Sequence, residues 1–210
     1  MNLRVARTPG TAMMLATIVA LTPARAMAQA PASSVRPWAL VTRLLVTGSS
    51  DRSDPPGYQA YSTFTLEAAV RRHLSRTLDT ELSVRTESRE IDSLFPAGEN
   101  RRLGSIELLP IALLLHYRLP TGAAWHPYAG AGVNLTVAWE KSGLLDSVDM
   151  RARVGPAVQV GTDLDLSSAA VLNVDLKWNK MTATLENAGT RLARIRLDPF
   201  SLGVGVGFRF

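Results

Sequence analysis

The stretch FSLGVGVGFRF, residues 200–210, decides the fold class. Its apolar residues stand at every second position, and serine, glycine or arginine fills the positions between them. Because side chains alternate between the two faces of a strand, this pattern puts the apolar groups on one face, whereas a helix needs a period near 3.6. The chain therefore ends in a β-strand with one apolar face and one small or charged face.

The same alternation runs through most of the chain. It marks residues 63–71, 78–87, 128–140, 153–166 and 172–179, and two further strands are expected near 37–47 and 105–119. Most of these runs exceed the roughly 5–6 residues typical of globular strands, and they match the roughly 9–11 residues that a tilted membrane strand needs. The expected fold is all-β, an eight-stranded antiparallel transmembrane β-barrel.

The connections between these strands fall into two classes. Short turns are expected at 74–77, 120–126 and 167–169, and longer polar loops at 48–60, 91–104, 141–150 and 185–191. The two classes alternate along the chain, as short periplasmic turns and longer extracellular loops do in outer-membrane barrels. Both ends of the barrel chain are then expected on the periplasmic side.

The N-terminal region is typical of a secretory signal peptide. Arg4 and Arg7 precede an apolar run at 11–22, and small residues at Ala26 and Ala28 give an A-x-A cleavage site. We expect a signal peptide at 1–28 and a barrel domain at 29–210. Beyond this region no run approaches the roughly 18 apolar residues of a membrane helix.

Composition excludes several functions. The chain has no cysteine, which rules out thiol catalysis, disulfide scaffolds and cysteine-ligated zinc. Residues 1–28 hold three arginines and no acid, so their removal lowers the formal net charge from +5 to +2. With no basic run interleaved with aromatic residues, we expect no nucleic-acid partner.

Aromatic residues lie near the ends of the expected strands, where they would form belts at the two membrane interfaces. The expected belt residues are Trp38, Tyr117, Trp125, Tyr128 and Phe208 towards the periplasm, and Trp139 and Trp178 towards the other side. The terminal Phe210 resembles the C-terminal signal that the barrel assembly machinery reads in bacterial outer-membrane proteins. A soluble barrel with its apolar face inside remains an alternative, because alternation alone does not distinguish inside from outside.

Four segments resemble the OmpW family of outer-membrane proteins. They are LLPIALLLHY at 108–117, PYAGAGVN at 127–134, NVDLKW at 173–178 and LDPFSLGVGVGFRF at 197–210, whereas the first half of the barrel matches by strand pattern only. The resemblance implies an eight-stranded barrel with a narrow, largely apolar lumen in the outer membrane of a Gram-negative bacterium, among its lipids and lipopolysaccharide. It also implies passive passage of small hydrophobic molecules, and some family members serve as colicin or phage receptors.

The strand near 105–119 carries apolar residues on both faces. If Leu109, Ile111, Leu113 and Leu115 face lipid, then the lumen is lined by Leu108, Pro110, Ala112 and Leu114. Such a patch could bind a small hydrophobic solute. The alternative is simple packing, since side chains fill the interior of eight-stranded barrels.

Prolines interrupt three expected strands, at Pro110, Pro156 and Pro199. Proline donates no ladder hydrogen bond, so each should mark a bulge, a kink or a strand end. We hypothesise that one of these breaks opens the barrel wall, so that an apolar solute can leave sideways into the membrane, and a gap beside Pro110 would support this. The alternative is that the prolines merely bend the wall. Pro199 is expected at a strand start.

Many charged residues share the inward face. The expected lumen charges are Arg43, Glu67, Arg71, Asp79, Glu81, Arg85, Arg153, Asp163, Asp175, Lys177 and Arg209. Because buried charges need partners, we expect a salt-bridged plug rather than an ion pore.

The sequence favours a channel over an enzyme. Lipid A hydrolases use a Ser-His-acid site, but His126 is followed by Pro127 and Tyr128 with no nearby serine on the same face. His73 and His116 stand alone and are expected at the membrane interfaces, so no catalytic residue, metal ligand or cofactor is assigned. A closed structural or receptor barrel that acts through its extracellular loops remains the alternative.

Overall fold

The computed structural model describes residues 36–48, 52–54, 58–60, 63–93, 101–121, 124–143, 152–187, 190–196 and 198–210. The expected signal peptide at 1–28 lies outside these residues. Within them, no helix is long and apolar enough to cross a membrane. The compact unit described below is Pro37–Arg209.

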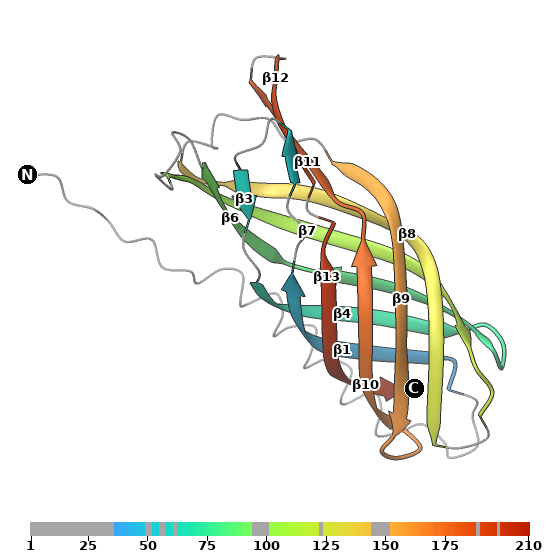
Figure 1. Ribbon diagram of the computed structural model, residues 1–210. Coiled ribbons are helices and arrows are strands. Elements are labelled where there is room, and N and C mark those ends of the chain that lie inside the picture. Colours follow the sequence, from blue (N-terminus) through green and yellow to red (C-terminus); the bar gives the residue numbers. More distant parts are fainter. Residues whose placement is uncertain are drawn as a thin grey trace, which may run out of the picture. The chain divides into compact units, whose positions relative to one another are not determined.

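The described chain is built almost entirely from strands (Figure 1). They are β1 (Trp38–Gly48), β2 (Arg52–Asp54), β3 (Tyr58–Ala60), β4 (Thr63–His73), β5 (Leu78–Arg85), β6 (Glu87–Ser93), β7 (Arg101–Arg118), β8 (Trp125–Lys141), β9 (Arg153–Asp165), β10 (Ala170–Asn179), β11 (Thr182–Asn187), β12 (Thr190–Arg196) and β13 (Phe200–Arg209). All the pairings between them are antiparallel.

These strands close into a barrel. The main sheet has the order β3-β6-β7-β5-β4-β1-β13-β10-β9-β8, and β7 also pairs with β8. Since β5 and β6 both run along β7 as two segments of one strand, the closed wall has eight members: β1, β4, β5/β6, β7, β8, β9, β10 and β13. The eight-stranded antiparallel barrel expected from the sequence is confirmed. A second sheet, β11-β12-β2, lies at the long-loop end.

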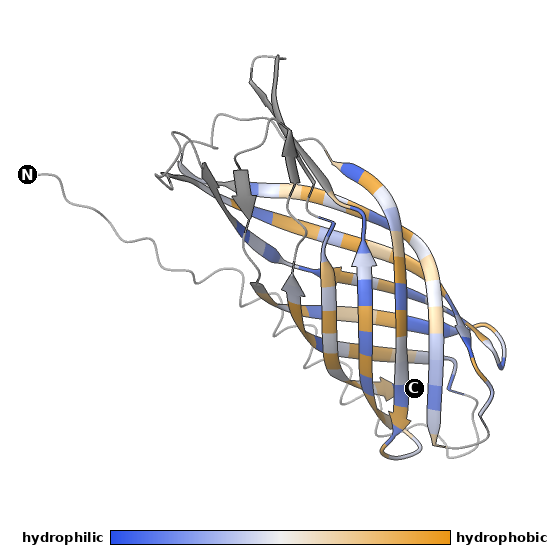
Figure 2. Ribbon diagram, viewed as in Figure 1, coloured by the Kyte–Doolittle hydropathy of each residue, from blue (hydrophilic) through white to orange (hydrophobic). Residues whose placement is uncertain are grey.

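The two faces of the wall have opposite chemistry, visible as alternating bands along the strands in Figure 2. On β1, Leu44 and Val46 are about half exposed on the outside, at 54% and 47%, whereas Arg43 and Thr47 are fully buried inside. A closed barrel pairs its backbone polar groups internally, so its apolar outer face can lie in lipid. The soluble alternative, with the apolar face inside, is therefore wrong.

Glycines on the inner face of β13 leave room for charged side chains. A Cβ on Gly203 would lie 2.7 Å from Asp175 Oδ1, and one on Gly205 would lie 2.9 Å from Arg43 Cγ. The alternating glycines of the C-terminal strand thus let a buried ion pair lie directly against the wall.

Candidate functional site: the barrel lumen

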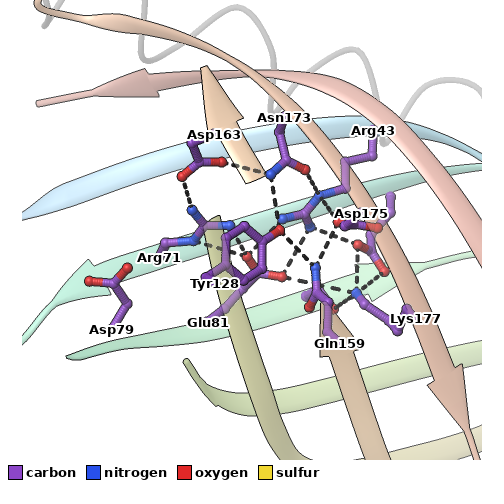
Figure 3. A network of polar contacts seen from close by, with 12 residues as sticks. Arg43, Arg71, Asp79, Glu81, Tyr128, Gln159, Asp163, Asn173, Asp175 and Lys177 are labelled. Atoms are coloured by element: carbon purple, nitrogen blue, oxygen red, sulfur yellow. Dashed lines mark hydrogen bonds and ion pairs between the residues drawn. The ribbon is translucent and has the colours of Figure 1, made fainter. Parts of the chain in front are cut away.

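Arg43 on β1 is the centre of a buried charge network (Figure 3). Its guanidinium contacts Glu67 on β4 at 2.8 Å, Glu81 on β5 at 2.8 Å and Asp175 on β10 at 2.7 Å. Its Nε also donates to Asn173 Oδ1 at 2.6 Å. One cation thereby connects four strands, β1, β4, β5 and the distant β10.

Two further cations extend this network. Lys177 Nζ donates to both oxygens of Glu67, at 2.8 Å each. Arg71 contacts Glu81 at 2.9 Å and pairs with Asp163 on β9. Each buried charge in this group therefore has an opposite charge beside it, which is the condition for keeping ions in a dry interior. The arrangement is the salt-bridged plug that the sequence predicts.

Aromatic rings complete the plug. The Tyr128 ring stacks on His116 with 4.8 Å between centroids, and the Arg71 guanidinium lies 4.8 Å from the Tyr128 centroid. The Tyr128 hydroxyl accepts hydrogen bonds from Asn173 Nδ2 at 3.0 Å and from Gln159 Nε2 at 3.3 Å. Rings and ion pairs together fill the middle of the lumen.

Two expectations about these aromatic groups are wrong. Tyr128 is 4% exposed and lies in the lumen, not in the aromatic belt. His116 is fully buried beside it, not at a membrane interface. The alternation on β8 could have predicted an inward-facing Tyr128, because Tyr128 is an even number of residues from the inward-facing Asn134.

An apolar wall lies on the inner face of β7. Leu108, Ala112 and Leu114 are 3%, 4% and 1% exposed, and Pro110 is buried with them. On the outer face, Leu113 and Leu115 are 52% and 50% exposed. The four residues expected to line the lumen thus share one inner face.

The ladder between β5/β6 and β7 is interrupted beside Pro110. β5 pairs with β7 as far as Val84↔Ile111, and pairing resumes on β6 with Glu87↔Leu108. Arg85 and Thr86 therefore have no ladder partner on β7, opposite Pro110 and Leu109. On its other edge, Pro110 keeps its pairing with Thr136 of β8.

The neighbouring ladder is interrupted near the same residues. The β4–β5 ladder has its last pair at Glu67↔Arg85, and β6 next pairs with β3 at Ala60↔Ile91. Within the described residues, the strand that contains Thr86 thus loses partners on both edges at the same height. The other two prolines differ, since Pro156 pairs with Val133 in the β8–β9 ladder and Pro199 directly precedes β13.

A second group of charged side chains lies beside this interruption of the ladder. Arg85 Nε donates to Glu87 Oε2 at 3.1 Å, and Arg85 Nη1 lies 3.7 Å from Glu67 Oε2. Arg89 pairs with the other oxygen of Glu87. Arg85 and Glu87 are 3% and 1% exposed. Glu87 and Arg89 were not assigned from the sequence, although they continue the inward parity of Glu81 and Arg85.

The remaining expected charges lie at the two barrel ends. Arg153 is exposed at the start of β9, so its assignment to the buried lumen is wrong: the strand begins there, beyond the packed interior. At the short-turn end, Asp165 pairs with Arg209 at 2.7 Å and with His126 at 2.9 Å. Asp79 there contacts His73 at 2.6 Å and pairs with Arg118.

The other belt residues face outward. Trp38, Tyr117, Trp125, Trp139 and Phe208 are 38%, 51%, 50%, 54% and 45% exposed, and Trp178 is half-buried. Within the part of the chain that the structure describes, no group of three or more His, Cys, Asp or Glu residues could hold a metal ion.

A closed antiparallel barrel of eight strands, apolar outside and ion-paired inside, defines a transmembrane barrel of the bacterial outer-membrane type. The family model described as "OmpW family" matches residues 62–210. The chain belongs to the OmpW family, which confirms the resemblance found in the sequence and places the protein in the outer membrane.

Individual relatives agree with this assignment. The outer-membrane protein y4mB of Sinorhizobium fredii is 28% identical over 191 residues, which cover 85% of this chain and 82% of y4mB. The dibenzothiophene metabolism operon protein PahQ of Pseudomonas aeruginosa is 31% identical over 115 residues, which cover 52% of this chain and 54% of PahQ. The match to PahQ thus spans about half of that protein.

Solved structures show the same fold. The crystal structure of OprG from Pseudomonas aeruginosa matches with a TM-score of 0.69 and 21% identity, covering 83% of this chain and 96% of OprG. The solid-state NMR structure of AlkL in DMPC lipid bilayers matches with a TM-score of 0.59 and 20% identity, covering 87% of this chain and 95% of AlkL.

Proposed function

We propose that the barrel gives small hydrophobic molecules a passive route across the outer membrane, with a lateral exit beside Pro110. The observation that carries this proposal is the coincidence of two features on β7. The inner face from Leu108 to Leu114 is apolar, and the ladder to the neighbouring strand is interrupted opposite Leu109 and Pro110. An apolar solute on this wall therefore lies next to the interruption of the ladder, which we call the seam: Arg85 and Thr86 opposite Pro110 and Leu109.

The plug favours a lateral exit through the wall over passage along the barrel axis. A hydrophobic solute that moved on towards the periplasm would have to displace Arg43, Glu81 and the stacked rings of Tyr128 and His116. Removing one partner from a buried ion pair costs about 3–5 kcal/mol, because the other charge is left without compensation. Leaving through the wall into lipid breaks none of these central pairs.

The relatives are consistent with apolar solutes. PahQ is named for a dibenzothiophene metabolism operon, and dibenzothiophene is an apolar aromatic heterocycle. The proposal gives the barrel no catalytic role. We also propose that Phe210 is read by the barrel assembly machinery, and that the long-loop end of the barrel contacts lipopolysaccharide.

A disulfide across the seam tests the exit. The chain has no cysteine of its own, so T86C together with L109C places two outward-facing thiols where the ladder is interrupted. In outer-membrane vesicles that contain the full barrel, oxidation should abolish the uptake of radiolabelled naphthalene, and dithiothreitol should restore it.

A matched pair provides the control for this experiment. L82C with L113C joins two outward-facing residues that already pair in the intact part of the same ladder, so its oxidation should leave naphthalene uptake unchanged. If the T86C/L109C disulfide forms and uptake persists, the exit beside Pro110 is wrong. If no variant exceeds vesicles that lack the barrel, the protein is a closed barrel whose function lies in its loops.

A further inference from the structure

The seam beside Pro110 has two chemically different sides on the lumen face. On β7 it is bounded by Leu108, Pro110 and Ala112, which are apolar and buried. On the β5/β6 side it is bounded by Arg85 and Glu87, which are buried and charged. The pairs on either side of the interruption, Val84↔Ile111 and Glu87↔Leu108, share one register, so Arg85 stands directly opposite Pro110. A solute that leaves through the seam must pass between an apolar wall and a guanidinium group.

The ion pairs around Arg85 are arranged so that one can be exchanged. Glu87 is held by two cations, Arg85 at 3.1 Å and Arg89 through its other oxygen. Glu67, the second carboxylate near Arg85 at 3.7 Å, is also held by Lys177 and Arg43 at 2.8 Å each. If Arg85 turned to a new anion, neither glutamate would be left without a positive partner.

A carboxylate is the anion that fits such an exchange. The planar guanidinium offers two parallel N–H groups to a carboxylate, and buried charges are tolerated only when they are paired. A solute carboxylate could therefore take the place of Glu87 on Arg85 at little net cost. A bare hydrocarbon would pass the same point without gaining any such interaction.

We propose that Arg85 is a specificity-determining residue that selects apolar molecules bearing one carboxylate, such as aromatic acids and medium-chain fatty acids, over bare hydrocarbons. The proposal rests on the lateral route proposed above and names the solute class for it. The apolar body of the solute lies against the β7 wall, and its carboxylate pairs with Arg85 during exit.

The test compares two probes with the same ring system, naphthalene and 2-naphthoate. Their uptake is measured in outer-membrane vesicles that carry the full barrel. Arg85→Gln should lower 2-naphthoate uptake about tenfold, equivalent to the loss of one charge-assisted hydrogen bond, and leave naphthalene uptake within about twofold. The matched control is Arg72→Gln, which removes a positive charge from the outer face, where Arg72 lies 5.2 Å from the centroid of the Trp38 ring.

The outcomes separate the two proposals. If neither probe enters faster than in vesicles lacking the barrel, the channel function fails. If both enter but Arg85→Gln leaves their ratio unchanged, the role of Arg85 is wrong and the channel stands. Folding is checked by the heat-dependent migration of the barrel on gels. If Arg85→Gln does not fold, Arg85→Lys is used instead, because lysine keeps the positive charge but lacks the planar pair of N–H donors. The ratio of 2-naphthoate uptake to naphthalene uptake should then fall about threefold. An unchanged ratio in this variant overturns the proposal.

Discussion

Arg43 is central to the ion pairs of the lumen, because three carboxylates from three strands converge on it. Arg43→Met leaves Glu67, Glu81 and Asp175 close together with one cation fewer among them. We expect this change to lower the free energy of unfolding by about 3–5 kcal/mol. Urea unfolding of the barrel in detergent, followed by tryptophan fluorescence, measures the change.

The contrast with an outward-facing arginine makes this prediction specific. Arg72→Met removes the same charge from the lipid-facing side, where Arg72 forms no ion pair with a carboxylate of the described residues, and should cost less than about 1 kcal/mol. Equal losses in the two variants would show that the lumen network contributes no more to stability than a surface cation does.

Asp165 at the periplasmic rim should make stability depend on pH. Burial raises the pKa of Asp165, but His126 and Arg209 beside it lower that pKa by more, so it lies below its ordinary value. A lowered pKa in the folded state stabilises the barrel above the unfolded pKa of about 3.9, and this contribution is lost as the pH falls through the folded pKa.

Asp165→Asn tests this contribution. At pH 7 the variant should be less stable than the wild type by no more than about 1 kcal/mol, because the site is largely solvated. The difference should shrink progressively as thermal unfolding is repeated at pH values below the unfolded pKa of about 3.9. A difference that persists at low pH would assign the effect to hydrogen bonding or packing instead of charge.

At the scale of the element, the alternation of apolar residues identifies each strand and its two faces, but not which charges meet. The two-residue alternation predicts that Arg43, Glu67 and Glu81 face the lumen, and all three are buried there. Their pairing depends on the register between neighbouring strands, which composition does not specify. The break at Arg85 and Thr86 carries no local signal of its own, because proline stands on the opposite strand. Only the three-dimensional pairing brings Pro110 to this point.

A prediction at this scale concerns Pro110 on β7. Pro110→Ala supplies a backbone N–H where the ladder lacks a donor. The barrel should gain about 1 kcal/mol in the free energy of unfolding, and naphthalene uptake should fall severalfold as the seam closes. Pro156→Ala is the control, because Pro156 lies on β9 in an uninterrupted ladder, and it should leave uptake unchanged. Equal uptake in the two variants would contradict a role for Pro110 in the exit.

In the whole molecule, the plug and the seam have opposite effects on transport: the plug closes the lumen along its axis, whereas the seam is the proposed exit through the wall. The central network of Arg43, Arg71 and Lys177 with their carboxylates closes the axis of the lumen, and the apolar side of β7 leads to the wall. A molecule built in this way should pass apolar solutes while it stays closed to ions. The sequence anticipates both features separately, but it does not show that they adjoin in one lumen, where Arg85 at the seam lies 3.7 Å from Glu67 of the plug.

Ion conductance therefore tests the whole arrangement. The barrel reconstituted in a planar lipid bilayer should conduct no more potassium than the protein-free bilayer, because eight strands leave no open aqueous pore once the interior is filled with side chains. Steady ohmic steps at low voltage would mean that the axis is open and that solutes can follow it to the periplasm. If conductance is absent and naphthalene uptake persists in the same preparation, the solute must leave through the wall. In the part of the wall that the structure describes, the ladder beside the apolar face of β7 is interrupted at the seam.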